Sequence, residues 1–121
     1  MSYDENKDTI KIISKSIINF NFLKDYLYDQ GFERRDLKHL TKAEYENTID
    51  MFVFRLFGAR IEITCFIESY GELFYECVCY KNENDIFLDG VKPKRYYSVE
   101  EVMNWIKDKI KKIVSAENAK D

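Results

Sequence analysis

The segment 49–80 constrains the fold more than any other part of the chain, because it is rich in strand-favouring apolar and aromatic residues and contains turn signals. Residues 60–68 alternate in polarity, as expected of a strand. One face would carry Ile61, Ile63, Cys65 and Ile67, and the other Glu62, Thr64, Phe66 and Glu68. After a turn at 69–71, residues 73–80 are expected to return antiparallel. Their face would carry Leu73, Tyr75, Cys77 and Cys79.

The segment 51–57 fits two structures. As a helix it would end a stripe at Gly58, following a helical turn that begins at the capping-box pair Thr41 and Glu44. As a strand it would precede a two-residue hairpin turn at Gly58 and Ala59, with Gly first, which is typical of a type II′ turn. The strand would carry Phe52, Phe54 and Leu56 on one face. Two phenylalanines around a valine favour the strand.

Residues 5–30 have the apolar periodicity of a helix. One face would carry Ile10, Ile13, Ile17, Phe20 and Leu27, whereas Ile12, Ile18, Phe22 and Leu23 fall elsewhere. A helix that is apolar over so wide an angle must be covered on several sides, or part of it meets a partner. Asn19 or Asn21 as a cap would instead split the segment into two helices, and Gly31 is a natural C-terminal stop.

A second helix is expected after residue 98, where Ser98 and Glu101 form a capping box. Its apolar stripe comprises Val99, Val102, Met103, Ile106, Ile110, Ile113 and Val114. Trp105 is expected beside this stripe rather than within it, and the tail 115–121 is expected to be frayed.

Together these elements predict an α+β fold in a single globular domain, 1–121. An antiparallel meander of three to four strands would pack against a long N-terminal helix and a C-terminal helix, as a two-layer sandwich. The fourth strand would be residues 86–88, ending at Asp89-Gly90, and the segment with Pro93 would be a loop leading to the last helix.

Charge and cysteine content narrow the function classes. A net charge of −3 argues against a dedicated binder of the phosphate backbone, which normally has a positive excess. The polar, acidic N-terminus lacks the pattern of a secretory signal peptide, and three cysteines cannot all pair within one chain. Reduced thiols and a cytoplasmic location are therefore expected.

No catalytic motif stands out. Cys65, Cys77 and Cys79 would share one sheet face, but they lack the paired knuckle spacing of structural zinc sites, so buried core thiols are favoured. His39 is the single histidine and lies in a charged stretch, which leaves little for a nucleophilic triad. The sequence therefore favours a non-enzymatic protein without a metal or cofactor.

One face of the predicted sheet mixes acids with aromatic rings. Glu62, Glu68 and Glu76 would lie there as solvated carboxylates rather than as catalysts, beside apolar residues such as Phe66. An apolar patch rimmed by acids is a plausible protein-binding surface. The candidate contact residues are Glu62, Phe66, Glu68, Tyr70, Glu72 and Tyr80.

The leading hypothesis is a small accessory protein of bacterial or phage type that acts by protein–protein binding. It would be an immunity protein or an anti-defence inhibitor, and its partner a toxin, a nuclease or a defence component. One alternative is a nucleic-acid-binding regulator that uses the basic and aromatic loop 92–97. Its candidate residues are Arg34, Arg35, Lys94, Arg95 and Tyr96. The other alternative is a small-ligand-binding domain. The oligomeric state is left open, and a homodimer is one possibility.

Overall fold

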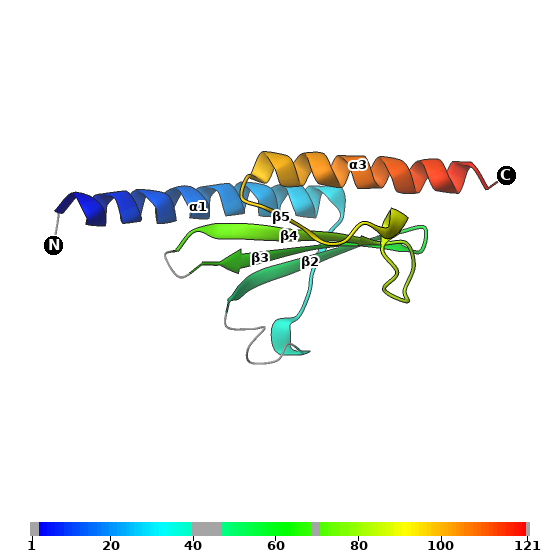
Figure 1. The fold of residues 1–121 in the computed structure, drawn as a ribbon, viewed down its shortest axis with the longest axis horizontal. Coiled ribbons are helices and arrows are strands. Elements are labelled where there is room, and N and C mark those ends of the chain that lie inside the picture. The colour runs from blue at the N-terminus through cyan, green and yellow to red at the C-terminus, as the bar shows by residue number, and fades with distance from the viewer. Residues whose placement is uncertain (1–2, 40–46, 69–70, 121) are drawn as a thin grey trace.

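The computed structural model describes residues 3–39, 47–68 and 71–120 (Figure 1). Two long helices and five strands form most of it. In chain order the elements are α1 (Tyr3–Gln30), β1 (Glu33–Arg34), the 3-10 helix η1 (Leu37–His39), β2 (Thr48–Leu56), β3 (Ala59–Ile67), β4 (Leu73–Tyr80), the 3-10 helix η2 (Leu88–Gly90), β5 (Lys94–Tyr96) and α3 (Val99–Asn118). The α+β prediction is confirmed, although the sheet has five strands and not three or four.

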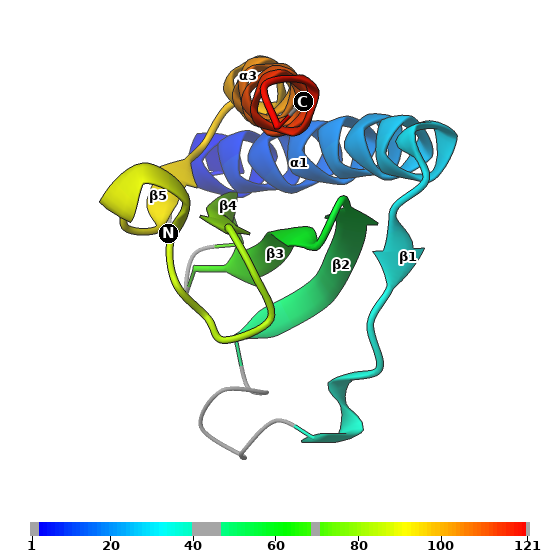
Figure 2. The same ribbon diagram turned by 90° about the vertical axis from the view of Figure 1, so that its right-hand side faces the viewer.

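The sheet is an antiparallel meander in which each strand pairs only with its sequence neighbours, in the order β1-β2-β3-β4-β5. Both α1 and α3 lie on the same face of this sheet (Figure 1). Seen after a 90° turn, α3 is viewed along its axis and α1 crosses beneath it (Figure 2). One face of the sheet is therefore covered by helices, and the other face carries neither α1 nor α3.

The segment 51–57 is a strand, and the helical alternative is wrong. The turn that follows lies one residue earlier than predicted, because Leu56 pairs with Ala59 and the two loop residues are Phe57 and Gly58. Both have positive φ, 50° and 81°, which is the signature of a type I′ turn rather than type II′. The type I′ twist matches that of the flanking strands, and it places Phe57 in a conformation that glycine or asparagine normally occupies.

The predicted alternation of the central strands is confirmed, and the core lies between the sheet and the helices. The sheet contributes Phe52, Ile61, Ile63, Cys65, Tyr75, Cys77 and Cys79, and the helices contribute Leu23, Leu27, Val102, Ile106 and Ile113. Trp105 also belongs to this core at 9% exposure, so its predicted place beside the apolar stripe is wrong. The stripe is wide enough to include it because α3 touches both the sheet and α1.

Residues 3–30 form one continuous helix, and the split at Asn19 or Asn21 does not occur. It ends as predicted at Gly31, where the Phe32 N–H donates to the Leu27 carbonyl and the Gly31 N–H donates to the Tyr28 carbonyl. This pair of bonds is a Schellman motif, which requires the positive φ of 100° that Gly31 adopts.

At the other helix, Ser98 accepts a hydrogen bond from the Glu101 N–H, as the capping box predicts. The helix α3 continues to Asn118, into the segment 115–121 for which fraying is predicted. The predicted helical turn at 41–44 lies outside the described residues.

The two edge strands were not predicted. β1 lies in a stretch without clear periodicity, and β5 lies in the segment expected to be a loop. The predicted strand 86–88 is wrong, since the segment forms only an isolated bridge from Phe87 to Tyr80 and then the 3-10 turn η2. Asp85 and Asp89 both have positive φ, which interrupts the extended backbone on either side of Phe87, and β4 pairs instead with β5 at residues 75–77.

Candidate binding surface on the open face of the sheet

The side chains that point away from the two helices form what we call the open face. It comprises Met51, Val53 and Arg55 of β2, Arg60, Glu62, Thr64 and Phe66 of β3, and Phe74, Glu76, Val78 and Tyr80 of β4. Its centre is a shallow hollow of about 220 Å³. The hollow is lined by Thr48, Met51, Glu62, Thr64, Phe66, Glu76, Val78, Tyr80 and Pro93. Apolar groups therefore lie between two carboxylates, as the alternation of β3 and β4 predicts.

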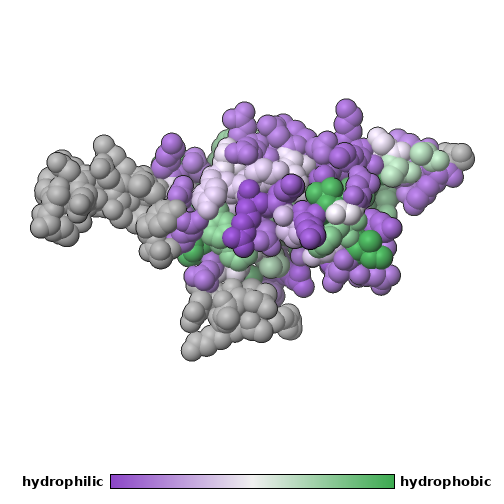
Figure 3. Space-filling view, in the orientation of Figure 1, coloured by the Kyte–Doolittle hydropathy of each residue, from purple (hydrophilic) through white to green (hydrophobic). Residues whose placement is uncertain are grey.

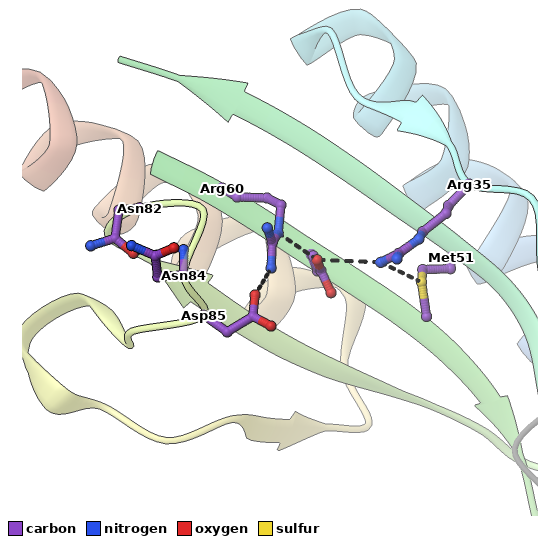
Figure 4. Close-up of polar contacts among 7 residues, drawn as sticks. Arg35, Met51, Arg60, Asn82, Asn84 and Asp85 are labelled. Carbon is purple, nitrogen blue, oxygen red and sulfur yellow. Dashed lines mark hydrogen bonds and ion pairs between the residues drawn. The ribbon is translucent and has the colours of Figure 1, made fainter. Parts of the chain in front are cut away.

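A network of charges that includes Arg35, Arg60 and Asp85 crosses one side of the open face (Figure 4). Glu62 belongs to the same network. Its carboxylate is 2.6 Å from Arg60 Nε and 3.4 Å from Arg35 Nη1. Among the residues that the structure describes, the Arg60 Nε–H has no hydrogen-bond partner, so the shorter contact is an ion pair without hydrogen-bond geometry. Arg60 also pairs with Asp85, which joins β3 to the loop after β4. The carboxylate of Glu62 thus lies between Arg60 of its own strand and Arg35, which directly follows β1.

Arg60 is the centre of this network. Its guanidinium lies over the Tyr80 ring, 4.5 Å from the ring centroid, and Tyr80 in turn stacks on Phe87. Partial burial alone would lower the pKa of Arg60, but the hydrogen bond that Arg60 donates to Asp85 and the charges of Glu62 and Asp85 raise it above its usual value. The guanidinium is therefore a permanent positive charge at this end of the hollow.

The other end of the open face is aromatic. The Phe66 and Phe74 rings stack with centroids 5.1 Å apart, and the Arg95 guanidinium lies 5.3 Å from the Phe74 centroid. Arg95 Nε is also 3.3 Å from the Glu76 carboxylate. Each carboxylate that lines the hollow is therefore engaged by an arginine, which suits a recognition surface better than an acid–base pair.

The structure brings together only part of the predicted contact set. Glu62, Phe66 and Tyr80 line the hollow. Glu68 lies beyond the end of β3, where it accepts a hydrogen bond from the Tyr97 hydroxyl, and this bond raises the pKa of Tyr97. Glu72 lines a different cavity, of about 510 Å³, between α1, the start of β4 and the N-terminus of α3. Tyr70 lies outside the described residues.

The residues predicted for nucleic-acid binding do not form one patch. Arg34 and Arg35 lie in or next to β1, whereas Lys94, Arg95 and Tyr96 form β5, and these strands are the two opposite edges of the sheet. Arg34 is also paired with the buried Asp50, at 2.7 Å. This pairing was not foreseen, although an aspartate inside an apolar strand is a signal that a cation must lie nearby.

The cysteines are core residues. Cys65, Cys77 and Cys79 are all buried beneath the helices. Burial raises the pKa of Cys65 to about 12, with a smaller contribution from Asp50, and raises that of Cys79 to about 11. The pKa of Cys77 is also raised, mainly by burial. Among the described residues, no group of three or more histidine, cysteine, aspartate or glutamate side chains is placed to hold a metal ion. The side chain of His39 is outside the described part.

The sequence does not predict that Arg60 and Arg35 pair with Glu62, since Arg35 was a candidate only for nucleic-acid binding and Arg60 was not a candidate. The place of Arg60 could have been predicted. Arg60 precedes Glu62 by two residues on the same strand, so the alternation rule alone places both on the open face. Arg35 could not be found in this way, because it lies 27 residues from Glu62 and reaches it only through the β1–β2 pairing.

The side of the molecule in Figure 3 is mostly hydrophilic, and its hydrophobic groups form small separate patches. In the part of the chain that the structure covers, neither helix has the length and apolar character needed to cross a lipid bilayer. No family model, curated protein or solved structure was found to match the chain.

Proposed function

We propose that the chain is a non-catalytic binding protein whose open face docks on another protein. By its size and its acidic, aromatic composition it fits the immunity or anti-defence inhibitor class, and the partner would be a toxin, a nuclease or a defence component. The observation that carries the proposal is the hollow of the open face, in which apolar side chains lie between arginine-paired carboxylates.

The composition of the open face supports a protein partner. Aromatic residues, methionine and arginine are enriched at protein interfaces, and all three occur here around a shallow depression. The guanidiniums of Arg60 and Arg95 lie over aromatic rings, so they are held in place before a partner arrives. A surface that is ordered in advance loses less side-chain entropy on binding.

The edges of the sheet are less suited to binding than its face. β1 has two residues and β5 has three, so each edge offers few free backbone groups to an added strand. Short, charged edge strands are a common means of preventing edge-to-edge pairing. A partner is therefore expected on the face, through side chains.

Thr64 provides the test, because it lines the hollow between Met51 and Glu76 and is 8% exposed. In Thr64→Arg the new side chain would fill the hollow, with the carboxylates of Glu62 and Glu76 beside it. Asn104→Arg, on the exposed surface of α3, adds the same charge elsewhere. The tagged wild-type protein and both variants would be used to capture partners from the native host, after circular dichroism confirms folding.

We expect one stoichiometric protein with the wild type and with Asn104→Arg, and its loss with Thr64→Arg. Equal capture by Thr64→Arg would remove the open face as the interface. Recovery of nucleic acid or a small molecule in place of a protein would contradict the proposed function itself. A charge reversal at Glu62 would be a less specific test, because a lysine there would lie beside Arg60 and Arg35 and would disturb the fold.

A further inference from the structure

The outer side of α1 carries large apolar side chains that the sheet does not cover. Leu23 and Leu27 are buried against the sheet, at 1% and 0% exposure, whereas Ile18 and Phe22 are 67% and 60% exposed. These two residues are four apart, so they lie next to each other on one side of the helix. The sequence predicts that so apolar a helix is covered on several sides or meets a partner on part of its surface, and Ile18 and Phe22 are left uncovered by the described residues.

Charged residues continue the same line along α1. Lys15 lies three residues before Ile18, and Asp25 lies three residues after Phe22. A spacing of three, four and three keeps all four on one narrow strip, as in a coiled-coil seam. Lys15 and Asp25 are both exposed, and neither forms an ion pair within the described part of the chain. We call Lys15, Ile18, Phe22 and Asp25 the α1 strip.

The α1 strip is complementary to itself when it is reversed. Positions 15 and 25 are equally far from position 20, and so are positions 18 and 22. If two copies of α1 lie antiparallel about a two-fold axis at this point, each Lys15 meets the partner copy's aspartate at 25, and each Ile18 meets a phenylalanine. A two-fold interface has this reciprocal form, in which residue i meets j and j meets i.

A parallel arrangement lacks this match. Each position would then face itself, which brings lysine to lysine and aspartate to aspartate, and like charges at facing positions are unfavourable. The sequence extends the reversed pattern by one step on each side, since Lys11 stands four residues before Lys15 and Asp29 stands four residues after Asp25. The charge order along the strip is thus basic, apolar and acidic, which selects the antiparallel register.

We propose that the occupant of the α1 strip is a second copy of this chain, forming a two-fold antiparallel pair of α1 helices. Ile18 and Phe22 supply the apolar centre, and Lys15 and Asp25 set the direction. The strip lies on α1, on the helical side of the sheet, whereas the proposed docking surface is on the opposite face (Figure 1). Each proposal can therefore be tested, and contradicted, without the other.

The first test is the apolar centre. Sedimentation velocity of the full chain over a wide concentration range should give twice the monomer mass of 14.5 kDa at high concentration. Phe22→Asp should remain a folded monomer throughout, because Phe22 is mostly exposed in the single chain. A wild type that is monomeric at every concentration, or a Phe22→Asp variant that dimerises as well as the wild type, would overturn the proposal.

The second test is a charge exchange that only the antiparallel register explains. Lys15→Asp and Asp25→Lys should each weaken self-association about tenfold or more, because two symmetry-related pairs change from attraction to repulsion. Lys111→Asp, an exposed change of the same charge on α3, should leave it unchanged.

Mixing Lys15→Asp with Asp25→Lys should restore the association as a mixed dimer, since both pairs are again opposite in sign. The double variant in one chain should also dimerise like the wild type. If the two single variants do not rescue each other, the proposed pairing is wrong, even if the protein forms a dimer through another surface.

Discussion

The two faces of the sheet are built from the same strands and are stabilised in different ways. On the helix-covered face, alternate residues of β3 and β4 are apolar, and nearly all of them are buried in the core with α1 and α3. On the open face neither α1 nor α3 lies over the strands, and yet Glu62 and Thr64 are only 9% and 8% exposed. The Arg35 and Arg60 side chains lie against the Glu62 carboxylate and help to cover it. Part of a sheet face can therefore be covered by side chains without a helix above it.

The stability of the two faces should respond to different perturbations. The buried face depends on the hydrophobic effect and on thiols that remain protonated, whereas the open face depends on ion pairs near solvent. The packing of the buried face should be sensitive to a loss of side-chain volume and to alkaline pH. The stability of the open face should fall when an arginine is removed, and the loss should be larger for a more buried arginine.

The largest expected effect is alkaline destabilisation through the buried face. The pKa values of Cys65 and Cys79 are raised to about 12 and about 11, and that of Cys77 is raised too, whereas the usual thiol value is 9.0. Because the fold retains protons that the unfolded chain releases, the stability they contribute is present below pH 9 and is lost as the pH rises toward 11 and above. With three thiols, the free energy of unfolding should fall by about 4 kcal/mol per pH unit once the unfolded thiols are ionised.

Urea denaturation at a series of pH values between 8 and 11 would measure this slope, with Cys65→Ala expected to reduce it by about a third. An unchanged midpoint across the range would mean that the thiols are reachable by solvent in the native state. Their protection from a thiol reagent at neutral pH, until denaturant is added, provides an independent check.

The next effect is the loss of volume on the buried face. Ile63 is 1% exposed and lies in the middle of β3, so Ile63→Ala should lower the free energy of unfolding by about 3 kcal/mol. Val53→Ala on the open face should lower it by only about 1 kcal/mol, because it removes two carbons rather than three and Val53 is 6% exposed. Chemical denaturation of both variants would compare the faces directly, and equal losses would show that the open face is packed as tightly as the core.

A smaller effect is expected from the centre of the charge network. Arg60→Met should lower the free energy of unfolding by about 1–2 kcal/mol, because the nearly buried Glu62 would retain only the longer contact to Arg35. Part of this loss should be recovered in Arg60→Met/Glu62→Gln, which removes the uncompensated charge. If the double variant is as unstable as the single one, the loss comes from the contact with Tyr80 and not from the ion pair.

The smallest effect is expected from the exposed arginine on the same face. The Arg95 side chain is 66% exposed, and its contact with Glu76 is 3.3 Å long. Arg95→Met should therefore change the stability by less than about 0.5 kcal/mol, and added salt should reduce the difference further. A loss as large as that of Arg60→Met would show that burial does not distinguish the two ends of the open face.

The sequence predicts those helices, strands and caps that have a recognisable pattern within their own residues. The alternation of residues 60–68, the capping box at Ser98 and the stop at Gly31 are local patterns, and each is confirmed. β1 and β5 have two and three residues, too few for any periodicity, so they exist only because β2 and β4 offer free edges. The predicted hairpin turn lies one residue too late in the chain, because no sequence pattern indicates a phenylalanine with positive φ.

The residues of the candidate surface also divide into those with a local sequence pattern and those without one. Glu62, Phe66 and Tyr80 were predictable from the alternation of two strands. The contribution of Pro93, and the long-range pairing of Arg35 and Arg95 with the carboxylates, depend on where the edge strands end. Separations of 27 and 19 residues between the paired groups place these contacts beyond the reach of any local pattern.

The strand order has a consequence for the way the chain folds. Because β2, β3 and β4 follow one another in both sequence and space, their pairings are nearly all local, and the two hairpins can form before the ends of the chain are in place. The packing of α1 is not local, because the strands and α3, against which it packs, all follow it in the chain. During synthesis, the apolar side chains of α1 that later pack on the sheet therefore stay exposed to solvent until the strands have been synthesised.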